Sequence, residues 1–140
     1  MAFKLKRGPS AFVTYPTSST TCAPGDVLDL SSNAVTRATS SSTVLTIECV
    51  AQETLAGTSV GVKAIPILPG AVQLWEADST NNTASNQLME DMVLTDHDTV
   101  NNTGTTSAAK EGIFRAIAVV GAAGDKKLLG YFHKPGQVVS

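Results

Sequence analysis

The closing third of the chain constrains the fold more than any other segment. Two apolar runs, residues 112–120 and 126–132, flank a short loop that contains two glycines. Apolar runs separated by a turn of this kind predict a β-hairpin packed into a barrel or sandwich. The polar side chains in its arms are Arg115, Lys126 and Lys127, so the hairpin is suited to burial rather than to chemistry.

Composition favours strands along the whole chain. A length of 140 residues indicates one domain with a core of its own. Only 16% of the residues are charged and 5% are aromatic, whereas Ser and Thr are abundant. Thr and Val suit a pleated strand, and Ser, Asn and Gly suit the turns. With about seven to nine short strands expected, the sequence predicts an all-β protein, a single small β-barrel or sandwich.

The first residues differ from the remainder. Residues 1–25 are broken repeatedly by proline, which interrupts both helices and strand ladders, and they predict an extended N-terminal arm. Residues 26–140 are expected to form the β-barrel domain. The arm is basic at its start and is expected to lie on its own barrel or on a neighbouring molecule. Its expected partner-binding residues are Phe3, Lys4, Lys6, Arg7, Phe12 and Tyr15.

Alternation predicts which side chains form the core. In the strand expected at 43–50, Leu45, Ile47 and Cys49 share a face without polar residues, so that face is expected to point inward. Residues 95–107 have no apolar period and predict a surface loop, followed by a short turn at 108–111. The hairpin residues expected to be buried against that strand are Phe114, Ile117, Val119 and Leu129.

No arrangement in the sequence predicts catalysis or a bound cofactor. Asp96, His97 and Asp98 combine imidazole and carboxylates, which can bind a metal or act as a base. Neighbours in an extended loop point in alternate directions, so we expect no metal there. His97→Ala is then expected to change stability by less than about 0.5 kcal/mol. Glu90 and Asp91 are expected to form a solvated face.

Charge and cysteine content narrow the partners and the compartment. The net charge of −2 gives no reason to expect nucleic acid, and no apolar run reaches the roughly 20 residues of a membrane span. The chain's start also lacks the apolar core of a secretory signal. Cys22 and Cys49 lack zinc-site spacing, and two buried thiols are favoured over a disulfide, which stays open. The basic start and a stretch at 64–109 without Lys or Arg allow electrostatic contact between copies.

Several segments, taken in order, resemble a known group of proteins. They are Pro24–Leu30, a strand ending in Glu48-Cys49-Val50, the acidic segment Leu94–Asn102, and the runs Gly112–Val120 and Lys126–Phe132. Across roughly residues 24–134, this order is similar to that of the small β-barrel capsid decoration proteins (cement or auxiliary head proteins) of tailed bacteriophages.

The resemblance implies a structural, non-enzymatic virion protein. Such a protein is made in the host cytoplasm and binds the major capsid protein on the outer face of the head. It is often a homotrimer, with an N-terminal arm that reaches a neighbour, and it stabilises the capsid lattice. The alternative is a carbohydrate- or host-surface-binding β module of a head fibre or tail, in which polar loops and Trp75 would supply the contacts, although a buried Trp is the ordinary expectation.

Overall fold

The computed structural model describes residues 2–58, 60–102 and 112–133, and these residues form an all-β fold, as the sequence predicts. Three single-turn 3-10 helices interrupt the strands: η1 (Gly70–Val72), η2 (Ser85–Gln87) and η3 (Ala123–Asp125). The strands are β1 (Lys4–Arg7), β2 (Val13–Tyr15), β3 (Thr20–Cys22), β4 (Val27–Ser31), β5 (Ala34–Arg37), β6 (Ile47–Ala51), β7 (Leu55–Thr58), β8 (Val62–Pro66), β9 (Leu74–Ser79), β10 (Asp91–Met92), β11 (Leu94–Asp96), β12 (Thr99–Val100), β13 (Phe114–Val120) and β14 (Lys127–Phe132).

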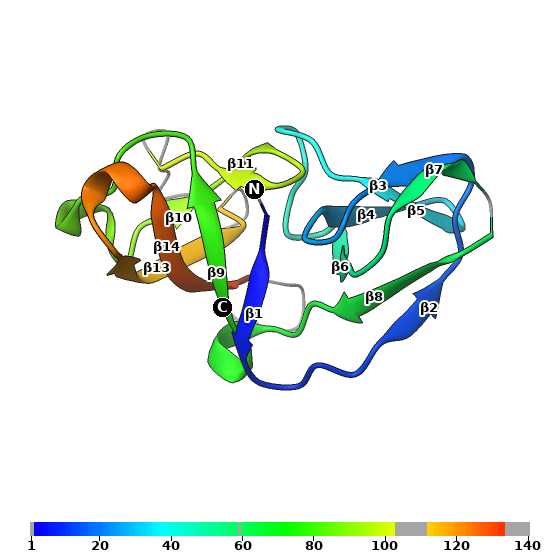
Figure 1. The fold of residues 1–140 in the computed structure, drawn as a ribbon, viewed down its shortest axis with the longest axis horizontal. Coiled ribbons are helices and arrows are strands. Elements are labelled where there is room, and N and C mark those ends of the chain that lie inside the picture. The colour runs from blue at the N-terminus through cyan, green and yellow to red at the C-terminus, as the bar shows by residue number, and fades with distance from the viewer. Residues whose placement is uncertain (1, 59, 103–111, 134–140) are drawn as a thin grey trace.

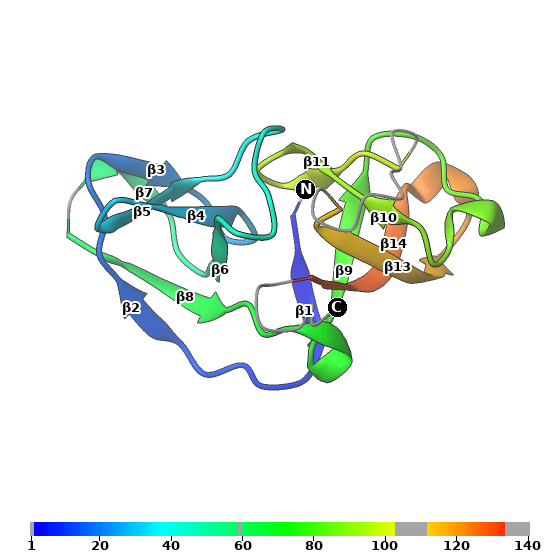
Figure 2. The ribbon, with the colours of Figure 1, turned by 180° about the vertical axis from the view of Figure 1, so that it is seen from behind.

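The strands form two main sheets and a small ribbon. A barrel-like sheet has the order β10-β13-β14-β9-β12-β11, with β1 also paired to β9. A five-stranded antiparallel sheet has the order β2-β8-β6-β4-β5, and β3 pairs with β7. Figures 1 and 2 show these two sheets as two lobes with β1 between them.

The predicted closing hairpin is present as β13 and β14, but its inward face is shifted. Ala116 pairs with Gly130 and Ala118 pairs with Leu129, so Ile117 is an extra residue in the ladder. Phe114 and Ala116 are buried, so alternation along the strand places Ile117 on the opposite face, where it is 37% exposed, and beyond the bulge Val119 packs against the core. The prediction that Ile117 is buried is therefore wrong. Val119 and Leu129 are only half-buried.

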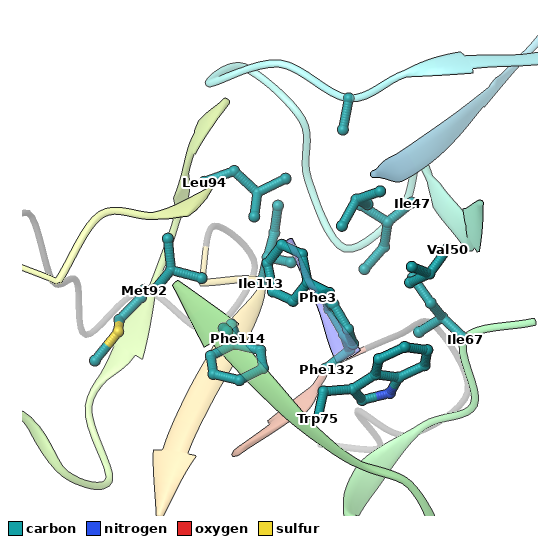
Figure 3. Packing of buried hydrophobic residues seen from close by; sticks show 14 of the residues in the cluster. Phe3, Ile47, Val50, Ile67, Trp75, Met92, Leu94, Ile113, Phe114 and Phe132 are labelled. Atoms are coloured by element: carbon teal, nitrogen blue, oxygen red, sulfur yellow. The ribbon is translucent and has the colours of Figure 1, made fainter. Parts of the chain in front are cut away.

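The larger of two hydrophobic clusters lies between the two main sheets. Trp75, Phe114 and Phe132 are fully or almost fully buried, and Phe132 meets both other rings edge-on at centroid distances of 5.7 and 5.4 Å. Figure 3 shows these rings facing Ile47, Val50 and other aliphatic side chains of the five-stranded sheet. Because side chains from both sheets interdigitate here, the two lobes share one hydrophobic core.

The strand predicted at 43–50 begins later than its sequence indicates. Residues 43–46 form a turn, in which the Thr46 amide donates to the Thr43 carbonyl at 3.1 Å, and β6 starts at Ile47. Leu45 lies in this turn and is 77% exposed, so the prediction that it is buried is wrong. Ile47 and Cys49 are buried as predicted.

The N-terminal segment lies on this chain's own sheets. β1 pairs with β9, β2 pairs with β8 and β3 pairs with β7, so residues 4–22 add a strand to each of the three sheets. The described part of the expected arm, residues 2–25, thus takes the first of the two expected positions, along the protein's own barrel. Within this segment, β2 lies at an edge of its sheet.

The predicted surface loop at 95–107 contains regular structure at its start. β11 and β12 form a tight hairpin, and β12 runs parallel to β9, pairing Thr99 with Asp78. Buried Asn102 then fixes the chain, since its side-chain amide donates to the carbonyl oxygens of Asn81 and Asn82 at 3.0 and 3.1 Å. The surface-loop prediction is therefore wrong for residues 95–102. Residues 103–107 and the expected turn at 108–111 lie outside the described residues.

Candidate functional site

Residues 6–14 form a continuous exposed segment near the N-terminus, which we call the strap. Every residue of the strap is exposed. Figure 1 shows it crossing from β1 in one lobe to β2 in the other. Its two ends are held by strand pairing, β1 to β9 and β2 to β8. The strap is therefore a fixed surface feature rather than a free tail.

A buried glutamine holds the middle of the strap. Gln73 is 1% exposed, and its amide nitrogen donates to the carbonyl oxygens of Pro9 and Pro66, both at 3.0 Å. Gly8 lies against the same region with φ of 111°, and a Cβ there would come within 2.3 Å of the Val72 carbonyl oxygen. The sequence therefore needs glycine at this position to let the strap pass close to η1.

The predicted partner-binding residues divide into two groups. Lys4, Lys6, Arg7 and Phe12 are exposed, and Phe12 is 57% exposed beside the edge strand β2. Together with Val13, which is 44% exposed, Phe12 forms an apolar end of the strap, and the cations form a basic end.

Phe3 and Tyr15 belong to the core instead. The prediction that Phe3 contacts a partner is wrong, because the side chain is 2% exposed and its ring lies 5.8 and 5.0 Å from those of Phe114 and Phe132. Tyr15 is half-buried against the smaller core cluster around Cys49. Burial raises the pKa of the Tyr15 hydroxyl to about 12, so it is a neutral phenol at physiological pH.

A groove of about 600 Å³ lies beside β1, on the protein surface. Its lining includes Lys4 and Ser10 from the N-terminal segment and Glu76, Asp78 and Lys127 from β9 and β14. The Lys127 ammonium contacts the Asp78 carboxylate at 2.6 Å, and the other Asp78 oxygen accepts a hydrogen bond from the Ala2 amide. The groove combines these polar groups with apolar lining residues such as Leu5 and Ile65, next to the basic end of the strap.

The structure brings Asp26 to the sequence neighbours His97 and Asp98. Asp26, His97 and Asp98 each place a potential ligand atom within 4.8 Å of the others. The expected loop triplet does not converge as a unit, since Asp96 is outside this group. The partner that the sequence analysis missed is Asp26, which precedes β4 in the opposite sheet, and only the fold could reveal it.

A second polar cluster consists of Asp91 in β10, Arg115 in β13 and His133, which follows β14. The Asp91 carboxylate is buried and accepts from Arg115 Nε at 2.8 Å, and it lies 3.0 Å from His133 Nε2. Burial raises the pKa of Asp91, but the hydrogen bonds from Arg115 and His133 outweigh it and hold the pKa below its ordinary value. The expectation of a solvated face at Glu90 and Asp91 is wrong for Asp91, whereas Glu90 is exposed.

The remaining residues singled out by the sequence are internal. Trp75 is fully buried, so it offers no aromatic platform at the surface. Cys22 and Cys49 are both buried thiols, as favoured by the sequence, and burial raises the pKa of the Cys22 thiol. These residues support the core rather than a site.

Comparison with known proteins leaves the chain without a family assignment. No known protein-family model matches it, and no curated protein matches it significantly. Within the described residues, no helix is long and apolar enough to cross a membrane.

Proposed function

We propose that this chain is a structural protein of a tailed-bacteriophage head, a decoration or cement protein that binds the outer capsid surface and performs no catalysis. Two considerations support the proposal. The order of the segments Pro24–Leu30, Leu94–Asn102 and Gly112–Phe132 resembles that group of proteins, and the fold is the all-β type that the resemblance implies.

The observation that carries the proposal is the strap, nine consecutive exposed residues held at both ends. A segment that is already fixed loses little conformational freedom when it binds, so more of its contact energy remains as affinity. Arg and aromatic side chains are enriched at protein interfaces, and the strap presents Arg7 at its basic end and Phe12 at its apolar end. This surface suits a protein partner that offers an apolar pocket beside acidic groups.

The proposed partner is the major capsid protein, and the proposed location is the outer surface of the virion after synthesis in the host cytoplasm. We further propose a homotrimer. Binding of several linked copies to a repeating lattice converts modest contacts at each strap into strong overall attachment. Lattice stabilisation would follow because each bound copy links neighbouring capsid subunits.

The alternative, a carbohydrate- or host-surface-binding module, loses one of its proposed contacts. Trp75 is fully buried and cannot stack on a sugar ring without unfolding the core. The polar loops could still supply hydrogen bonds, and a glycan array distinguishes this alternative directly.

The test measures binding to capsids assembled from the major capsid protein of the same phage genome. Phe12→Ala is expected to weaken binding at least about tenfold, the effect of losing roughly 1.4 kcal/mol at an interface anchor. Leu45→Ala is the matched control, because Leu45 is also an exposed apolar side chain but lies outside the strap. Lys6→Glu tests the basic end, with the exposed Arg37→Glu as the control of equal charge change.

Several results would contradict the proposal. Wild-type protein that does not bind the capsids would remove the proposed function. Equal binding by the Phe12→Ala and Leu45→Ala proteins would remove the strap as the contact surface. Sedimentation analysis of the free protein tests the trimer separately.

A further inference from the structure

The turn between β11 and β12 reaches across to the first residue of β4. The Val27 amide donates to the His97 carbonyl at 2.7 Å, so the backbone of this turn is fixed against the five-stranded sheet. Figures 1 and 2 show β11 on the side of its lobe that faces β4. This backbone contact places the His97 and Asp98 side chains over Asp26.

The Asp26 carboxylate is buried and incompletely compensated. Its side chain is 5% exposed. One oxygen accepts a hydrogen bond from the Ala23 amide at 2.9 Å, and the other lies 3.0 Å from His97 Nδ1. Among residues 2–58, 60–102 and 112–133, no Lys or Arg forms an ion pair with it. Burying a carboxylate without a cation costs folding free energy, so a positively charged group beside this oxygen would stabilise the fold.

The contact between His97 and Asp26 is not a hydrogen bond, so it does not satisfy the Asp26 carboxylate. His97 Nδ1 is shielded from solvent and makes no hydrogen bond, despite its 3.0 Å distance from the Asp26 oxygen. The nitrogen and oxygen are thus close neighbours that are not aligned with each other. Ligand atoms around a tetrahedral Zn²⁺ are about 3.3 Å apart, so this spacing is that of two atoms sharing one ion.

The third side chain is oriented by its own turn. The Asp98 amide donates to the Asp96 carboxylate at 3.1 Å, and Thr99 Oγ1 donates to Asp98 Oδ1 at 2.9 Å. The bond from Thr99 holds one oxygen of the Asp98 carboxylate at the edge of the cluster, where the residue is half-buried. The potential ligand atoms of the three residues lie within 4.8 Å of one another.

We propose that Asp26, His97 and Asp98 bind one divalent transition-metal ion, with Zn²⁺ as the preferred ion. Imidazole with carboxylates suits Zn²⁺, whereas Mg²⁺ and Ca²⁺ prefer sites made of oxygen alone. A divalent ion neutralises the two carboxylates. Its remaining coordination position faces solvent, because His97 and Asp98 are only partly buried. This proposal differs from the expectation from sequence, which was that Asp96, His97 and Asp98 bind no metal.

Such an ion would connect the two main sheets. Asp26 precedes β4 of the five-stranded sheet, and the other two ligands lie between β11 and β12 of the barrel-like sheet. A ligand that binds only the folded state raises stability in proportion to the logarithm of its excess over Kd. Zn²⁺ at about 100 times its Kd is expected to raise Tm by roughly 5–10 °C for a chain of this size.

The experiment titrates metal-stripped protein with ZnCl₂ by calorimetry and follows Tm in parallel. The expected result is one Zn²⁺ per chain. Asp98→Asn and His97→Gln are expected to weaken binding more than about 100-fold, because changes to groups merely supporting a metal ligand already cost about 10–100-fold. Asp125→Asn is the matched control, since Asp125 is an exposed acid in another turn, and it should bind like wild type.

The titration of wild-type protein decides the proposal even if a variant fails to fold. Absence of stoichiometric binding, or no rise in Tm with Zn²⁺, overturns it. Equal Zn²⁺ affinity of the folded Asp98→Asn and Asp125→Asn proteins also overturns it. Either outcome leaves the proposed capsid binding untouched, because the strap contributes no ligand.

Discussion

Removal of the Asp91 carboxylate tests how the buried polar cluster supports the closing hairpin. Asp91→Ala leaves Cβ in place against Gly112, so the variant loses the charge without a new steric contact. What disappears is the shared acceptor of Arg115 and His133. The expected result is a folded but clearly less stable protein.

The magnitude follows from the exposure of the two abandoned partners. Breaking a buried ion pair by removing one member costs about 3–5 kcal/mol. The His133 side chain is 8% exposed and would keep an unsatisfied nitrogen. The Arg115 side chain is 30% exposed and can be solvated in part. The loss is therefore expected near the lower end, about 3 kcal/mol.

Urea unfolding at neutral and acidic pH measures both the loss and its origin. The ordinary pKa of Asp91 is 3.8, and the folded protein holds it lower, so the unfolded state binds the proton more readily. Stability from Asp91 is therefore complete above about pH 4 and is lost as the pH falls below it. The Asp91→Ala protein should show a smaller fall in stability between pH 5 and pH 3 than the wild type.

Glu90→Gln is the matched control, because Glu90 is the exposed neighbouring carboxylate. It should stay within about 0.5 kcal/mol of the wild type. An Asp91→Ala protein that is as stable as the Glu90→Gln protein at neutral pH, or that loses stability with acid as steeply as the wild type, would refute the reasoning.

Three further changes test the core. Phe114→Ala, which empties a fully buried ring position, should cost about 3–5 kcal/mol in thermal or urea unfolding, and a melting point within a few degrees of the wild type would contradict the central place of the hairpin. Gly130→Ala should cost at least about 1–3 kcal/mol by the same assay, since its Cβ would lie 2.1 Å from the Arg115 carbonyl oxygen; an unchanged protein would show that β13 and β14 are less closely paired. Leu45→Ala should be nearly neutral, within about 0.5 kcal/mol, because the side chain is 77% exposed, and a loss of several kcal/mol would restore the buried position that its strand pattern indicates.

Local patterns predicted the local elements of this fold. Turn-forming residues and proline also mark element boundaries: β4 and β5 meet at the Ser-Ser-Asn segment, and β8 ends at Pro66, which has no amide proton to donate. The apolar arms of β13 and β14 were likewise evident, because both the runs and the loop lie within some twenty neighbouring residues.

Contacts between distant segments could not be predicted in this way. A one-residue bulge at Ile117 reverses the inward face of a strand and leaves no mark in the alternation of residue types. A phenylalanine at position 3 gives the same sequence pattern whether it packs in the core or against a partner. Its contact with Phe132, which only the structure reveals, shows that it packs in the core. Asp26 and His97 meet because two sheets pack together, so no spacing in the sequence links them.

The position of Phe3 has a consequence for how the protein folds during its synthesis on the ribosome. Its ring packs against Phe132, and β1 pairs with β9, so Phe3 and β1 are synthesised well before the residues that they contact. During translation, the edge of β1 stays unpaired until β9 has left the exit tunnel, and Phe3 lacks its contact with Phe132 until β14 has left it. Native contacts between such distant residues slow folding and leave sticky intermediates. High-level expression should therefore favour inclusion bodies at high temperature, and slower synthesis should raise the yield of folded protein.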